Sequence, residues 1–119
     1  MNSRSDATQQ ILDRLYEVVV SRREMRPDGS YVVALLDGGW EAIAAKIREE
    51  SEELILAAKE ESQDALAHEV ADLFFHVWVM MASRGVQPNA VYAELARRFG
   101  VGGLEEKASR KQESGEDRT

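Results

Sequence analysis

The chain of 119 residues contains no cysteine, so neither a disulfide nor a thiolate contributes to its structure or chemistry. Only two prolines and eight glycines interrupt it, which leaves long stretches in which helices can form. Acidic residues outnumber basic ones, 22 to 15, so the formal net charge is −7, and no basic stripe is visible of the kind that binds nucleic acid. We therefore expect neither a disulfide scaffold nor a nucleic-acid-binding protein.

Long hydrophobic runs are missing as well. The first ten residues are polar and lack an apolar signal core, and the longest apolar run, residues 73–82, is too short to span a bilayer. We therefore expect a cytoplasmic protein without membrane contact. With 44% hydrophobic and 31% charged residues, the composition is typical of one globular domain, which we place at residues 1–110. The polar residues 111–119 are expected to form a disordered tail.

Hydrophobic spacing predicts an all-α fold of about four helices. Apolar residues recur at intervals of three and four in four segments: about residues 6–26, 40–60, 63–84 and 88–99. Ser62 stands at the N-cap position of the third helix, and Pro88 fits the start of the fourth. A short apolar segment, residues 31–36, lies between a turn and a glycine pair, and its pattern does not distinguish helix from strand.

The third predicted helix is apolar on nearly every side from Val70 onward. Such a helix needs more cover than three short neighbours in the same chain can supply. We therefore expect a helical bundle that is completed by a homodimer.

Two acidic pairs stand where this pattern predicts buried surface. Glu50/Glu53 and Glu69/Asp72 each have i, i+3 spacing, which places the two carboxylates of a pair on one helix face. A buried carboxylate without a partner is costly, so four that converge need a cation. Ligands that are all oxygen favour Mg²⁺ or Mn²⁺ over zinc. The competing interpretation is an ordinary solvated helix face, and the pattern alone does not decide between them.

A magnesium site of this kind would suit phosphoanhydride hydrolysis. The ion binds best when a phosphate chain completes its coordination shell, and it polarises the phosphoryl group. Glu49 is the catalytic candidate, which could position or deprotonate the attacking water, although the spacing also allows it to be a ligand. Lys46, one turn before Glu50, is a candidate phosphate contact, or an ion-pair partner on its own helix. His76, alone on an apolar face, is better explained as a hydrogen-bonded core residue.

The acidic residues and their surroundings resemble a known family. The pattern EExxE at residues 49–53, followed by ExxD at 69–72, is similar to the signature of all-α, MazG-type nucleotide pyrophosphohydrolases. The Pro-Asp-x-Ser-Tyr segment at 27–31 and the segment 103–110 narrow the resemblance to the phosphoribosyl-ATP pyrophosphohydrolase family. It covers about residues 11–111, which is most of the chain.

That resemblance implies Mg²⁺-dependent hydrolysis of the α–β phosphoanhydride of phosphoribosyl-ATP. The products would be phosphoribosyl-AMP and pyrophosphate, in the second step of histidine biosynthesis. The residues that match the family's metal-binding positions are Glu50, Glu53, Glu69 and Asp72. Glu49 completes the acidic cluster. Lys107 and Arg110 match the family's tail, and this makes them candidate phosphate or ribose contacts in addition to Lys46.

Two positions depart from the family's pattern. Ala34 stands where a basic residue is common, and Arg48 stands where a glycine is common. Neither change touches a proposed metal ligand, so we expect activity to survive. Two alternatives remain open: a MazG-type enzyme acting on nucleoside triphosphates, and a catalytically silent helical dimerisation module.

Overall fold

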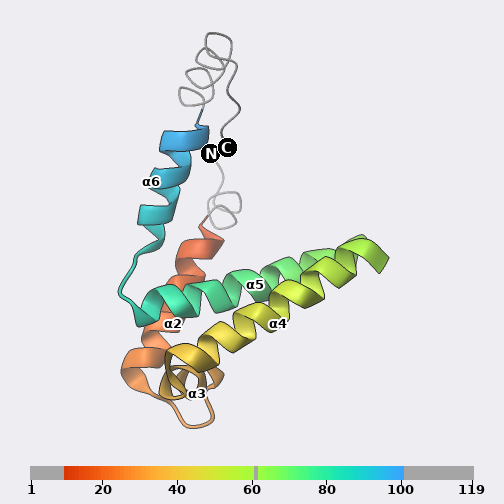
Figure 1. The fold of residues 1–119 in the computed structure, drawn as a ribbon. Helices are drawn as coiled ribbons and strands as arrows, with labels where there is room; N and C mark the ends of the chain where they lie inside the picture. Colours follow the sequence, from red (N-terminus) through yellow and green to blue (C-terminus); the bar gives the residue numbers. More distant parts are fainter. Residues whose placement is uncertain (1–9, 61, 101–119) are drawn as a thin grey trace. The chain divides into compact units, whose positions relative to one another are not determined.

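The computed structural model describes residues 10–60 and 62–100, and this part of the chain is all-α, as predicted. It contains five helices and no strand (Figure 1). They are α2 (Ile11–Met25), α3 (Tyr31–Asp37), α4 (Gly39–Glu60), α5 (Gln63–Ser83) and α6 (Pro88–Phe99). The described residues divide into two compact units, one ending at Val86 and the other beginning at Gln87. The single domain over residues 1–110 stays a prediction, and the tail 111–119 lies outside the described residues.

Helix α3, which is additional to the four predicted helices, is the segment whose apolar pattern does not distinguish helix from strand. Ser30 caps its start, because the Ser30 side chain accepts a hydrogen bond from the backbone N–H of Val33 at 3.3 Å. Val32 and Leu35, one turn apart, are both buried. A helix of seven residues is not stable alone, so this packing decides its conformation.

Local signals set the helix ends much as the sequence predicts. The Ser62 side chain accepts a hydrogen bond from the backbone N–H of Ala65 at 3.2 Å, which makes it the N-cap of α5. Gly85, with φ +73°, follows the end of that helix. Pro88 occupies the first turn of α6, where its missing N–H has no cost.

In the first unit, α4 and α5 pack lengthwise as an antiparallel helical hairpin (Figure 1). The largest fully buried side chains are Val19 of α2, Ile43 of α4 and Val79 of α5. The ring nitrogen of Trp78 also donates to the backbone carbonyl of Leu12 at 2.8 Å, which ties α5 to α2. The hydrophobic core therefore holds together α2, α4 and α5.

Helix α5 is long and apolar enough to cross a membrane by length and composition. However, it carries Glu69, Asp72 and the buried His76, and it packs against α4 and α2. Its length and composition are therefore weak evidence for a membrane span. Only 22% of its most apolar window is fully buried within one chain, and most of the other residues in α5 are half-buried.

Candidate functional site

The hairpin of α4 and α5 brings most of the predicted acidic ligands together. Glu50 and Glu53 project from α4, and Glu69 projects from α5. Each offers a carboxylate oxygen, and these atoms all lie within 4.8 Å of one another. Two i, i+3 pairs on adjacent antiparallel helices can face each other. In this structure the carboxylates of Glu50, Glu53 and Glu69 meet in one group.

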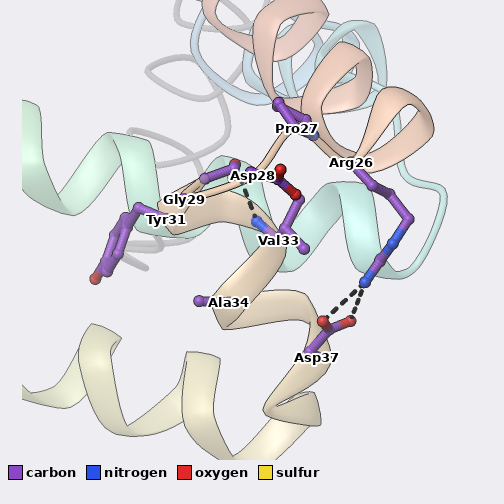
Figure 2. Close-up of a pocket in the computed structure, with 9 residues that line it drawn as sticks. Arg26, Pro27, Asp28, Gly29, Tyr31, Val33, Ala34 and Asp37 are labelled. Atoms are coloured by element: carbon purple, nitrogen blue, oxygen red, sulfur yellow. Dashed lines mark hydrogen bonds and ion pairs between the residues drawn. The ribbon is translucent and has the colours of Figure 1, made fainter.

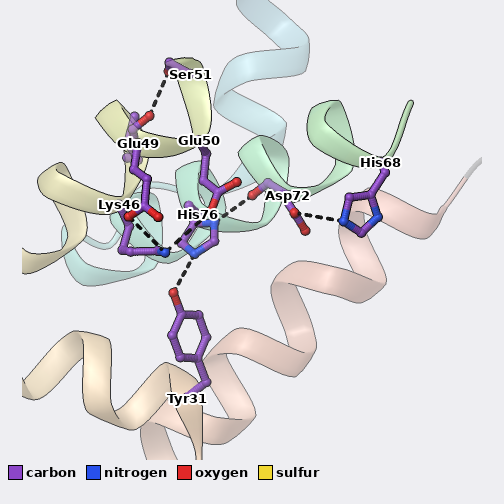
Figure 3. Close-up of polar contacts among 9 residues, drawn as sticks. Tyr31, Lys46, Glu49, Glu50, Ser51, His68, Asp72 and His76 are labelled. Carbon is purple, nitrogen blue, oxygen red and sulfur yellow. Dashed lines mark hydrogen bonds and ion pairs between the residues drawn. The ribbon is translucent and has the colours of Figure 1, made fainter. Parts of the chain in front are cut away.

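Asp72, the fourth predicted ligand, belongs to a second group. Atoms of His68, Glu69 and Asp72 lie within 4.8 Å of one another, and His68 Nε2 is 3.3 Å from Asp72 Oδ2 (Figure 3). Glu69 is therefore shared by the two groups. His68 is not among the predicted site residues, although its i, i+4 spacing from Asp72 places the two side chains on one helix face.

The donor set fits a hard divalent cation. Glu50 is buried, and one oxygen of its carboxylate, Oε2, has no hydrogen-bond partner within the described residues. The same holds for Oε2 of Glu69. A buried, unpaired carboxylate oxygen is costly unless a cation or water meets it. Together with Glu53 and Asp72, these oxygens make the donor set that Mg²⁺ or Mn²⁺ prefers.

Lys46 lies beside this acidic group. Its Nζ is 3.2 Å from Glu49 Oε2 and 3.6 Å from Glu50 Oε1 (Figure 3). The hydrogen bond to Glu49 raises the pKa of Lys46 above 10.5, Tyr31 and the two glutamate charges add to this rise, and burial opposes it. The ammonium group is therefore charged at neutral pH, and its side chain, 31% exposed, remains accessible to a ligand.

His76 lies one turn beyond Asp72 on α5 and is buried, as predicted for a hydrogen-bonded core histidine. Its Nδ1 is 2.7 Å from the backbone carbonyl oxygen of Asp72. Its Nε2 is 2.8 Å from the hydroxyl of Tyr31 in α3 (Figure 3). Both ring nitrogens thus have partners, and the histidine joins α5 to α3.

An open pocket of about 690 Å³ adjoins the turn between α2 and α3. At its rim, Arg26 Nη2 donates to both carboxylate oxygens of Asp37 at 2.8 and 2.9 Å (Figure 2). Ser30, Tyr31 and Ala34 also line it. The departure at Ala34 therefore falls in this pocket. Lys107 and Arg110 lie outside the described residues, so their contacts stay predictions.

Known proteins match most of this chain. The family model for phosphoribosyl-ATP pyrophosphohydrolase matches residues 12–99, a span that includes both acidic pairs. A phosphoribosyl-ATP pyrophosphatase of Rhodopirellula baltica is 51% identical over 109 residues, which cover 87% of this chain and 91% of the relative.

Two further relatives carry the same name. The protein of Trichlorobacter lovleyi is 43% identical over 107 residues, covering 90% of this chain and 99% of the relative. The protein of Methylococcus capsulatus is 46% identical over 101 residues, which cover 85% of this chain and 96% of the relative. Such identity over nearly the full length of each relative means that the chain belongs to the phosphoribosyl-ATP pyrophosphohydrolase family.

Proposed function

We propose that this chain hydrolyses the α–β phosphoanhydride of phosphoribosyl-ATP, producing phosphoribosyl-AMP and pyrophosphate in the second step of histidine biosynthesis. The observation that carries the proposal is the group formed by Glu50, Glu53 and Glu69, with two buried carboxylate oxygens that lack a partner among the described residues. Membership of the family and the names of its relatives support this substrate over a nucleoside triphosphate.

Four carboxylates would hold the metal: Glu50, Glu53, Glu69 and Asp72. The two acidic groups share Glu69, so the half-exposed Asp72 carboxylate lies next to a member of the first group. When bound there, Mg²⁺ supplies positive charge that offsets the charge of the phosphate chain and of the leaving pyrophosphate. Mn²⁺, which also prefers oxygen ligands, is the expected substitute.

The protein's own groups would then orient the substrate and accept a proton. Lys46, charged and partly exposed, binds a phosphate oxygen of the substrate. Glu49, whose side chain is 55% exposed, accepts the proton from the attacking water. The oxygen of this water then bonds to a phosphorus atom of the α–β anhydride, while the bond from that phosphorus to the bridging oxygen breaks. Lys107 and Arg110 are proposed as further substrate contacts on the strength of the family resemblance.

A homodimer in the cytoplasm is part of the same proposal. Large apolar side chains remain exposed on the hairpin, including Ile55 and Leu56 of α4 and Phe74 of α5. Burial of such side chains is favourable, and a second copy of α4 and α5 would offer a matching apolar face. A cytoplasmic location suits a family of soluble biosynthetic enzymes.

The direct test is pyrophosphate release from phosphoribosyl-ATP with Mg²⁺ and then with EDTA. We expect fast release that EDTA abolishes and that is much slower with dCTP or dUTP. Preference for a nucleoside triphosphate would instead identify a housekeeping enzyme. Absence of any Mg²⁺-dependent heat with a non-hydrolysable nucleotide would identify a catalytically silent module.

A further inference from the structure

The ring of Tyr31 is held in one orientation although much of the residue is exposed. One face of the ring stacks on Phe75 of α5, with ring centroids 6.0 Å apart and an interplanar angle of 20°. The hydroxyl lies 2.8 Å from Nε2 of His76, and the two ring planes stand at 84° to each other. Contacts on one face and at the hydroxyl together fix the plane of the Tyr31 ring.

The exposure of Tyr31 leaves the opposite face of its ring open to a ligand. Tyr31 is 48% exposed, and within residues 10–60 and 62–100 only Phe75 stacks on its ring. Tyr31 also lines the open pocket of about 690 Å³ at the turn between α2 and α3, a volume within the range of small-molecule sites. A fixed aromatic face with space beside it is suited to stack a flat ligand.

This aromatic face lies close to the candidate metal-binding residues. His76, which holds the Tyr31 hydroxyl, has its other ring nitrogen 2.7 Å from the backbone carbonyl oxygen of Asp72. One imidazole ring therefore separates the hydroxyl from the backbone of Asp72 (Figure 3). Helix α3, which carries Tyr31, also packs against both α4 and α5. The span suits a single nucleotide, with its phosphate chain at the carboxylates and its base at Tyr31.

We propose that Tyr31 binds the adenine base of the substrate by stacking, and that His76 is a positioning residue that holds the Tyr31 ring. Stacking of a base on an aromatic side chain tightens binding by about ten-fold or more. A ring that is already fixed loses little conformational freedom when the base binds. Tyr31 therefore selects a nucleotide over free pyrophosphate. The identity of the base rests on the proposed function, whereas the fixed ring rests on the contacts of Tyr31.

A pair of ligands tests the base contact without turnover. α,β-Methylene-ADP and methylenediphosphonate both resist hydrolysis and share the same bridged phosphorus groups, but only the first carries a base. In calorimetry with Mg²⁺, the wild type should bind the nucleotide at least about ten-fold more tightly. Tyr31→Leu should lose most of this preference and bind methylenediphosphonate as the wild type does. Tyr31→Phe, which retains the ring, should retain most of the preference.

Trp40→Leu is the matched control, because it removes another accessible aromatic ring, 58% exposed on α4. It should leave the preference for the nucleotide unchanged. An unchanged preference in Tyr31→Leu, an equal loss in Trp40→Leu, or no preference in the wild type would overturn the proposal.

The positioning role of His76 has its own comparison. His76→Phe should reduce the preference for the nucleotide, because the Tyr31 hydroxyl loses its partner. His76→Gln, whose side-chain oxygen can accept from the hydroxyl, should recover part of it. Weaker binding of both ligands by His76→Phe would instead show a merely structural role and overturn this part of the proposal.

A measurement on the unaltered protein reads the contact directly. Nuclear Overhauser effects should connect the adenine protons of bound α,β-methylene-ADP to the ring protons of Tyr31, and their absence at saturation would overturn the proposal. Failure of the wild type to hydrolyse phosphoribosyl-ATP would refute the proposed function and leave these binding results intact. An active enzyme whose KM is unchanged by Tyr31→Leu would refute the stacking role alone.

Discussion

Glu49 and Glu50 are neighbours in the chain but have different surroundings. The side chain of Glu50 is 8% exposed, whereas that of Glu49 is 55% exposed. Successive side chains on a helix point about 100° apart, so only one of the two can face α5. This division suits a buried metal ligand at Glu50 and a proton acceptor on the solvent side at Glu49, with Lys46 in contact with both.

The buried carboxylate of Glu50 leads to the first prediction. Glu50→Gln should reduce pyrophosphate release by at least about 100-fold, because a direct metal ligand is lost. The melting temperature without metal should stay the same or rise, since like charge is removed from the group with Glu53 and Glu69. Enzyme assays and thermal unfolding, each with and without Mg²⁺, measure both effects.

The matched control is Glu52→Gln, an exposed glutamate on the same helix. It should retain activity and the stabilisation by Mg²⁺, which Glu50→Gln should lose because a ligand stabilises only the state that binds it. Wild-type activity in Glu50→Gln would disprove the metal assignment.

The raised pKa of Lys46 predicts a dependence of stability on alkaline pH. A group whose pKa is higher in the folded state stabilises the fold fully below its ordinary value of 10.5, and this contribution is lost as pH rises through the folded-state value. Lys46→Met should therefore lower the free energy of unfolding by at most about 1 kcal/mol at pH 7. The difference from wild type should shrink above pH 10.5.

Urea unfolding at several pH values measures this difference. Lys59→Met is the control, because Lys59 is exposed in the last turn of the same helix. It should show no comparable loss at pH 7. A Lys46→Met effect that grows with pH would contradict the assigned ion pairs.

At the scale of the elements, the hairpin of α4 and α5 determines the site. The two helices are joined by a short connection around Ser62, whose side chain caps α5. Glu69 lies two turns into that helix. The position of the first turn of α5 therefore affects the distance from the Glu69 carboxylate to those of Glu50 and Glu53.

The cap provides an element-scale prediction. Ser62→Ala should lower the free energy of unfolding by about 1 kcal/mol, because the N–H of Ala65 loses its side-chain acceptor. Ser62→Asp should retain most of the stability, since its carboxylate can also accept and suits a helix N-terminus. Ser83→Ala, at the other end of α5, is the control for loss of a serine hydroxyl. Equal stability of Ser62→Ala and wild type in urea would contradict the cap.

At the scale of the whole molecule, the apolar surface of one chain is incompletely covered. Trp40, Ile55 and Phe74 are each more than 40% exposed, and only 22% of the apolar window of α5 is fully buried within one chain. Surface of this kind on a soluble protein commonly marks a partner site. This is the physical basis of the proposed homodimer.

Phe74→Lys tests the dimer. The substitution should raise the dimer dissociation constant at least about ten-fold, because a lysine would be placed in an apolar interface. Sedimentation equilibrium should then detect single chains where the wild type sediments as pairs. Met25→Lys, at a 78% exposed position at the end of α2, should leave the mass unchanged. A wild type that sediments as a single chain would disprove the dimer.

Much of the fold could be predicted because its signals are local. The bounds of α6 match the predicted helix, and the Ser62 cap lies where it was placed. The segment that became α3 could not be assigned, because its conformation depends on the burial of Val32 and Leu35 against other elements. The contact of His68 with Asp72 is not among the predictions either, although the sequence has the i, i+4 spacing that permits it.

The sequence by itself determined that this protein is helical, that it carries two acidic pairs, and which family it resembles. The first two properties follow from the spacing of apolar side chains and charges along a regular helix, whereas the resemblance rests on the residues of the motifs themselves. Only the tertiary structure decided that Glu50, Glu53 and Glu69 converge while Asp72 pairs with His68, and that Tyr31 meets His76. The contacts between different helices depend on how the helices pack. The contact of His68 with Asp72 lies within α5 and depends on the orientation of the two side chains.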